Sequence, residues 1–252
     1  MEVLAFLTQL QKSLIIAKKN VRIYYLKGPV IIFGLIAPFF LFFAYMMGRN
    51  LTVRELLPGL LGMTTFFTST SVGPAIAPWE ARSRTLERLV STPIAAWTIF
   101  LGDTISSFLF GVVFSVIPLS MAGFLGIDVP GMLVLGFGVV LASFCFASMS
   151  ILLSSYPPTD IPATVMMVSS VVKFPLVFIS GVFIPVENLP GWARGLAALS
   201  PLTYFTDLAR HVIQGSGCYP IPLDLAMLAV FALLFLVAAI KLHLKSLPKR
   251  LA

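Results

Sequence analysis

The chain has 252 residues, of which 58% are hydrophobic and 11% charged, and its formal net charge is +7. This apolar content exceeds that of soluble domains, so the composition indicates an integral membrane protein. The basic residues gather near the chain ends and in one interior loop without interleaved aromatic residues, which excludes nucleic acid as the expected partner.

Residues 1–27 are expected to form an amphipathic helix on the inner membrane surface. Apolar residues recur near helical spacing, and basic residues gather toward the end of the segment (Leu4, Leu7, Leu10, Leu14 and Ile15; Lys12, Lys18, Lys19, Arg22 and Lys27). A solvated basic leader is the alternative, but an apolar stripe needs a surface to cover it. A cleavable secretory signal is not expected, because the following apolar run is too long for one.

Six apolar runs are long enough to cross a bilayer, since about 20 apolar residues span its hydrocarbon core. They are residues 28–48, 56–77, 99–126, 132–154, 162–184 and 221–242. Backbone polar groups in lipid must be satisfied within each segment, and no run alternates as barrel strands do, so each is predicted to be a helix. The predicted fold is an all-α polytopic membrane protein, residues 1–252, with six transmembrane helices.

The distribution of lysine and arginine predicts the orientation of these helices. If the N-terminus lies inside, most basic residues fall on the cytoplasmic side, and the outer side holds only Arg49, Arg54, Arg194 and Arg210. Cytoplasmic loops carry the excess of positive charge in membrane proteins. Both termini and the loop 78–97 are therefore expected in the cytosol.

The loop 78–97 holds the most charge-dense interior stretch and is predicted to form a short amphipathic helix outside the membrane, bracketed by Pro78 and Pro93. Apolar residues at helical spacing lie on one side, and charged residues lie on the other (Leu86, Leu89 and Val90; Glu80, Arg84, Glu87 and Arg88). Arg84 is expected to pair with Glu80 or Glu87 across one turn. The alternative is a solvated loop that merely follows the positive-inside rule.

The order of residues in this loop resembles the first cytoplasmic loop of ABC-2 type transporter permeases. The resemblance implies a coupling helix that docks on a separate ATPase subunit and is formed by Glu80, Arg82, Thr85, Leu86, Glu87, Arg88 and Pro93. A downstream stretch resembles the exit-side segment of the same family and contains Gly181, Pro185, Pro190, Pro201, Tyr204 and Arg210. These two matches, in the expected order, identify the family but leave the substrate open.

Residues 185–220, before the last predicted span, are expected to contain two short helices over 190–199 and 202–214. Apolar residues recur at helical intervals in both, and Ser200-Pro201 separates them. The resemblance implies that these helices dip into the outer leaflet near the substrate exit. An ordinary extracellular cap on the bundle is the alternative.

Lys173 is the one charge near the middle of a predicted span, too deep for its side chain to reach water easily. Asp160 precedes it by roughly 20 Å along a helix and cannot be its partner. Lys173 is therefore expected to face a translocation path, a wet cavity or a subunit interface, unless Pro175 breaks the helix. Asp103, near the start of another span, is expected to be a polar anchor beside the basic loop.

Groups for catalysis are missing from the sequence. It contains no G-x-x-x-x-G-K-[ST] phosphate loop and no H-E-x-x-H motif, and its only histidines are His211 and His243. The cysteines, Cys145 and Cys218, are expected at different membrane depths, so a disulfide or metal pair is not expected. No cofactor or metal is expected on this chain. The sequence also lacks the catalytic groups that a membrane hydrolase would need.

The resemblance implies a non-catalytic permease of a prokaryotic cytoplasmic membrane that exports a drug-like, lipid-linked or saccharide substrate. It further implies a second copy of the chain or a paralogous permease, and a separate ATPase that binds ATP-Mg. A secondary transporter driven by an ion gradient is the main alternative, but it predicts repeated halves and midplane acidic residues, which are not visible here. A non-transporting scaffold also stays open.

Overall fold

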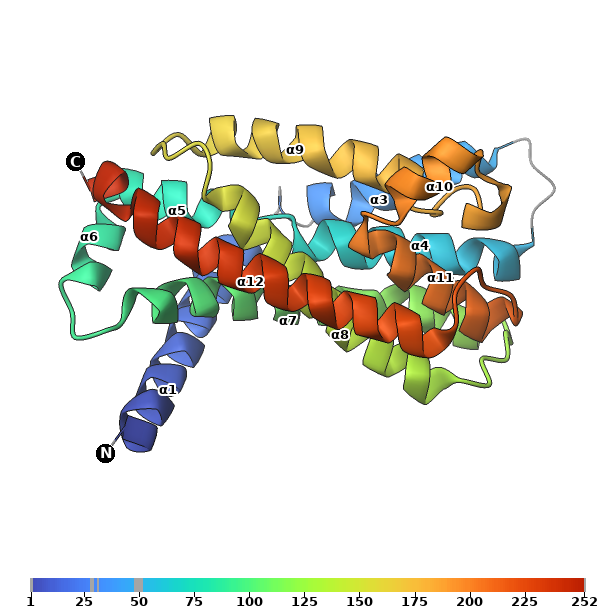
Figure 1. The fold of residues 1–252 in the computed structure, drawn as a ribbon, viewed down its shortest axis with the longest axis horizontal. Helices are drawn as coiled ribbons and strands as arrows, with labels where there is room; N and C mark the ends of the chain where they lie inside the picture. The colour runs from blue at the N-terminus through green and yellow to red at the C-terminus, as the bar shows by residue number, and fades with distance from the viewer. Residues whose placement is uncertain (1, 28–29, 31, 48–51, 252) are drawn as a thin grey trace.

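The computed structural model describes residues 2–27, 30, 32–47 and 52–251, and every regular element in them is helical (Figure 1). The all-α prediction is confirmed for this part of the chain. The helices that make up most of the bundle are α4 (Val53–Ser69), α7 (Ala96–Phe124), α8 (Met132–Ser154), α9 (Pro162–Ile179) and α12 (Ile221–Leu251). The remaining elements are α1 (Glu2–Asn20), η1 (Val21–Tyr25), η2 (Ile32–Ile36), α3 (Ala37–Met46), α5 (Gly73–Arg82), α6 (Thr85–Val90), η3 (Val186–Asn188), α10 (Gly191–Ala197) and α11 (Pro201–Gln214).

Four described helices are long and apolar enough, by length and composition, to cross a membrane. They are Ala96–Phe124, Met132–Ser154, Pro162–Ile179 and Ile221–Pro248. They correspond to the last four predicted spans, and α8 has the predicted bounds. The fifth predicted span is too long, because α9 ends at Ile179 and the chain turns over residues 180–184. α12 begins at the start of the last predicted span and continues beyond it to Leu251.

The first two predicted spans are not single helices of this length. Part of the span 28–48 lies outside the described residues, and its described part forms η2 and α3. The prediction of one continuous helix over 56–77 is wrong, because residues 70–72 separate α4 from α5. The six-span count therefore stays a prediction.

The break between α4 and α5 has a cause in the sequence. In a continuous helix the amide of residue 74 would donate to the carbonyl of Thr70, but Pro74 has no N–H. The Thr70 hydroxyl donates to the Phe66 carbonyl (2.8 Å) and the Ser71 hydroxyl to the Thr68 carbonyl (2.9 Å). Such local side-chain bonds give the backbone an alternative to the helical ladder, so the helix ends here.

The core of the bundle forms around α11, which contacts α4, α8 and α12. Every residue from Pro201 to Arg210 is buried. Phe146 of α8 packs against Phe66 of α4 and Phe205 of α11, with ring centroids 5.2 and 6.1 Å apart. The two short helices predicted over 190–199 and 202–214 are confirmed as α10 and α11, and the apolar face of α11 is covered by the bundle.

Close contact between α1 and α7 depends on Gly102. A Cβ at this position would lie 2.7 Å from Cγ2 of Ile16 and 2.8 Å from the Ser13 carbonyl oxygen. Small residues allow helix backbones to approach in this way. This contact holds α1 against the bundle, while Figure 1 shows its N-terminal end projecting away from it.

We expect Gly102→Ala to destabilise the protein by about 1–3 kcal/mol, because the added methyl overpacks the α1–α7 contact. The measurement is thermal unfolding of the purified protein in detergent. Gly136→Ala on α8 is the matched control, since a Cβ there meets no atom within 4 Å. Equal stability of the two variants would contradict the close approach of α1 to α7.

Candidate functional site

The predicted coupling segment is formed by the end of α5, a turn, and α6, which lie at one end of the bundle (Figure 1). The prediction of one helix bracketed by Pro78 and Pro93 is wrong. Pro78 lies inside α5, and the chain turns at Ser83 and Arg84, whose φ of 54° is in the left-handed region. The Ser83 hydroxyl donates to the Trp79 carbonyl (2.7 Å), which helps to end α5.

The seven predicted coupling residues divide between two faces of this segment. Glu80 and Leu86 are buried, with 0% and 1% of their surface exposed. Thr85 is half-buried, and its hydroxyl donates to the Glu80 carbonyl (3.2 Å). The other members are exposed and are Arg82, Glu87, Arg88 and Pro93. One face therefore anchors the segment, and the other presents charges away from the bundle.

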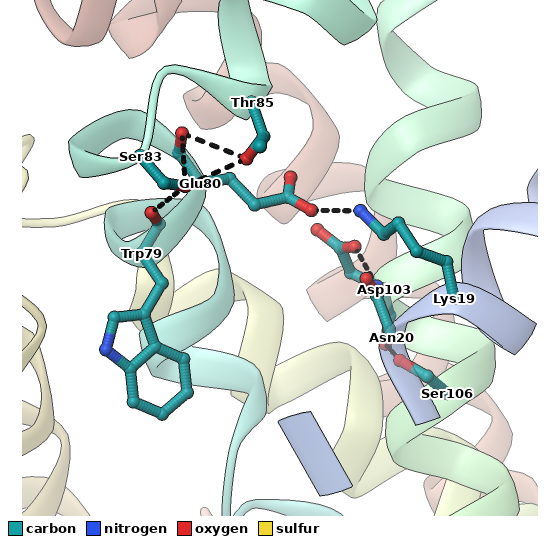
Figure 2. A network of polar contacts seen from close by, with 8 residues as sticks. All are labelled: Lys19, Asn20, Trp79, Glu80, Ser83, Thr85, Asp103 and Ser106. Atoms are coloured by element: carbon teal, nitrogen blue, oxygen red, sulfur yellow. Dashed lines mark hydrogen bonds and ion pairs between the residues drawn. The ribbon is translucent and has the colours of Figure 1, made fainter. Parts of the chain in front are cut away.

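Glu80 pairs with Lys19 of α1, not with Arg84 as the helical spacing predicted. The Lys19 ammonium donates to Oε1 of Glu80, while the Lys19 side chain remains 29% exposed (Figure 2). Burial raises the pKa of the Glu80 carboxyl, and the neighbouring Lys19 ammonium offsets part of that rise. Oε2 of Glu80 has no hydrogen-bond partner within the described part of the chain. The buried carboxylate thus depends on one cation from another helix.

Asp103 of α7 lies beside this pair (Figure 2), so it is a polar residue next to the basic loop, as predicted, but it is buried, with 1% of its surface exposed. Nδ2 of Asn20 donates to Oδ1 of Asp103 across 2.6 Å. We call Lys19, Asn20, Glu80 and Asp103 the polar cluster. Its hydrogen bonds tie Glu80 of α5 to α1 and α1 to Asp103 of α7, so α5 and α7 are linked through α1.

A second set of contacts ties α1 to the chain that follows α6. The Lys12 ammonium donates to the Pro93 carbonyl (2.7 Å). Oε1 of Gln9 accepts hydrogen bonds from the Ala95 amide (3.1 Å) and the Thr98 hydroxyl (3.0 Å), which caps the start of α7. Together with the polar cluster, these contacts attach α1 to the predicted coupling segment at both of its ends.

The predicted exit-side residues lie around α10 and α11, as the sequence placed them. Pro190 precedes α10, Pro201 begins α11, and Pro185 precedes η3, positions that suit the fixed φ of proline. Gly181 has a φ of 75°, and its carbonyl accepts a 3.0 Å hydrogen bond from Nη2 of Arg210.

Tyr204 and Arg210 both hold the chain around α11. The Tyr204 hydroxyl donates to the Ala198 carbonyl (2.8 Å), which ties α11 to the end of α10. Arg210 is 4% exposed, and its Nη1 has no partner among the described residues. The structure therefore brings Gly181 and Arg210 into contact. Tyr204 instead contacts the residue that follows α10.

Lys173 lies within an unbroken α9, so the alternative in which Pro175 breaks the helix is wrong. The side chain is 5% exposed, and its ammonium donates to the Thr70 carbonyl across 3.2 Å. This is the carbonyl that Pro74 leaves without a helical partner. Lys173 also lines a cavity of about 290 Å³ between α3, α4 and α9.

These features describe a helical protein with four described helices long and apolar enough to cross a membrane, and with an exposed charged segment at one end that contacts α1. The family model described as ABC-2 type transporter matches residues 6–213, and the chain belongs to that family. The resemblance inferred from the two motifs is thereby confirmed.

Two similar proteins are permeases by name. The chain is 26% identical over 171 residues to the probable multidrug ABC transporter permease YbhR of Escherichia coli, a match that covers 62% of this chain and 42% of that protein. It is 33% identical over 118 residues to the daunorubicin resistance ABC transporter permease protein DrrB1 of Streptomyces coeruleorubidus, covering 44% of this chain and 38% of that protein. The matched region spans less than half of either relative.

Proposed function

We propose that this chain is the membrane-spanning permease subunit of an ATP-driven exporter. A separate ATPase subunit binds ATP-Mg and hydrolyses it, while this chain carries no catalytic residue. Two permease copies, or this chain and a paralogue, form the membrane part in a prokaryotic cytoplasmic membrane, with both termini in the cytosol. Similarity to permeases named for multidrug and daunorubicin resistance favours a drug-like substrate over a lipid-linked or saccharide one, and it does not favour the ion-gradient alternative.

The observation that carries this proposal is the two-faced coupling segment. Its exposed residues Arg82, Glu87 and Arg88 are available to a partner of complementary charge. Its buried Glu80 is held by Lys19 of α1, beside Asp103 of α7. A push on α6 by a closing ATPase would thus move α1, α5 and α7 together and would not be absorbed by a flexible loop.

The test of this function is co-expression of the chain with an ABC-type ATPase subunit from the same organism. We expect the two subunits to co-purify and the ATP hydrolysis rate to change when the ATPase joins the permease in proteoliposomes. A permease that purifies alone and leaves hydrolysis unchanged would contradict the proposal.

The proposed orientation predicts opposite accessibility for Ser83 and Gly191. Both residues are exposed, and they lie in the coupling turn and at the start of α10. A cysteine at position 83 should react with a membrane-impermeant maleimide only from the cytosolic side, and one at position 191 only from outside. The measurement is labelling of intact cells against inverted vesicles in a background without Cys218, which is itself exposed. Labelling of both positions from one side would rule out this orientation.

A further inference from the structure

Lys173 is a buried cation without a counterion in the part of the chain that the structure describes. Its ammonium has three N–H donors, and the Thr70 carbonyl accepts one of them. The ion pair found among the described residues joins Lys19 and Glu80, at another site. A buried charge is costly unless it is paired and hydrogen-bonded, so two donors of Lys173 and its charge are available to a ligand.

Apart from Lys173, the cavity is lined mostly by apolar side chains, together with the hydroxyls of Ser71 and Ser170, and the Ser71 hydroxyl donates to the Thr68 carbonyl. Its walls include Leu41 of α3, Met63 and Phe67 of α4, and Phe174 of α9. The hydroxyl of Ser170, which also lines it, donates to the Met166 carbonyl (2.9 Å), so that proton is already used. Among the lining residues, the charge comes from Lys173 alone. The cavity thus combines an apolar wall with one cationic group.

A second cavity, of about 280 Å³, lies near the exit-side residues and gives a useful contrast. Arg210 lines it, but so does the carboxylate of Glu55, which accepts hydrogen bonds from the amide and hydroxyl of Thr52. The opposite charges of Arg210 and Glu55 offset one another. A net positive charge is therefore a property of the Lys173 cavity and not of the exit-side cavity.

We propose that the Lys173 cavity binds an amphipathic anion, with its carboxylate, sulfonate or phosphate head on the ammonium and its apolar body against Met63, Phe67 and Phe174. The head completes the hydrogen bonds of the ammonium and neutralises its charge, while the body replaces water on the apolar wall. A cationic or neutral molecule of the same shape cannot neutralise the charge of the ammonium, and it forms no charge-assisted hydrogen bond of this kind. That the bound anion is also the exported substrate rests on the proposed function.

The test compares radiolabelled octanoate with its methyl ester, which has the same alkyl chain but carries a methyl group in place of the negative charge. Equilibrium dialysis measures saturable binding to the purified chain in phosphatidylcholine nanodiscs, after subtraction of binding to empty discs. We expect octanoate to bind about tenfold more tightly than its methyl ester, because its carboxylate adds a charge-assisted hydrogen bond. Equal affinity of the acid and the ester for the unmodified chain would overturn the proposal.

Four variants separate the anion site from a structural role of Lys173. Lys173→Arg should keep the preference for the acid, and Lys173→Met should lose it. Lys241→Met, at an exposed position on α12, is the control and should keep it. Should Lys173→Met fail to fold, Ser170→Leu fills the cavity with the lysine intact and should weaken both probes. Retained acid preference in Lys173→Met, or unchanged binding in Ser170→Leu, would overturn the assignment.

The anion can come from the bilayer or from solution, and a second lipid composition distinguishes these sources. If phosphatidylglycerol in the nanodiscs displaces octanoate from the unmodified chain but has no effect in Lys173→Met, the ligand is an anionic lipid. If octanoate still binds in those discs, the ligand is a free amphipath. Because this assay needs neither ATP nor the ATPase, binding without transport would count against the proposed function alone, and transport without acid preference would count against the anion site alone.

Discussion

Replacing Lys19 with methionine is expected to destabilise the protein by about 2–4 kcal/mol at neutral pH, because it leaves a buried carboxylate without a cation. Glu80 is 0% exposed, and the ammonium of Lys19 is the positive group bonded to it. Glu80→Gln should cost only about 1 kcal/mol, because Lys19 is 29% exposed and can turn its charge to water. The two partners of one ion pair should therefore give unequal losses.

The destabilisation caused by Lys19→Met is expected to depend on pH. Burial already raises the pKa of Glu80, and loss of the Lys19 ammonium removes the group that lowers it. The folded state then holds a proton that the unfolded state has released, so the destabilisation is present at neutral pH and shrinks as pH falls toward the unfolded value of about 4.3. Lys19→Met should thus recover stability relative to the unmodified protein as pH is lowered.

Thermal unfolding of the purified chain in detergent between about pH 5 and pH 8 measures these effects. The double variant, Lys19→Met with Glu80→Gln, should be more stable than Lys19→Met alone, because it no longer buries an unpaired carboxylate. Equal losses for the two single variants, or no rescue in the double variant, would show that the pair is not buried as described.

Reversing charges on α6 is expected to impair assembly with the ATPase. Glu87→Lys and Arg88→Glu each remove a charge from the exposed face of the coupling segment and leave the opposing charge of the docked partner unpaired. Truncating one partner of a buried interfacial pair costs about 2–5 kcal/mol, which is a loss of affinity of at least about tenfold. A solvated loop would lose less than about 1 kcal/mol for the same change.

The measurement is co-purification of the ATPase and permease-dependent ATP hydrolysis. Lys245→Glu, an exposed reversal on α12, is the matched control and should assemble normally. The stability of the isolated permease should change by less than about 0.5 kcal/mol in all three variants, because the altered side chains are exposed. If the α6 variants assemble like the α12 control, the segment is only a topogenic loop.

Hydropathy along the chain predicts where most helices lie. Apolar runs of spanning length predicted α8 with its bounds and α7, α9 and α12 with shifted ends, because burial in lipid requires long uncharged helices. The order of residues in the loop and in the exit-side segment is sufficient to identify the family. The break after Ser69 was also encoded, by Pro74, but a hydropathy pattern does not register a missing backbone donor.

Which polar groups meet depends on how the helices pack against one another. Local helical spacing paired Glu80 with Arg84, whereas the folded chain pairs it with Lys19, 61 residues earlier. The same holds for Lys173 and the Thr70 carbonyl, which are 103 residues apart. Spacing along one helix reports only neighbours on that helix. A buried charge is matched by whichever group the packing of other helices brings within hydrogen-bond distance, and that packing depends on features such as the close approach of α1 to Gly102.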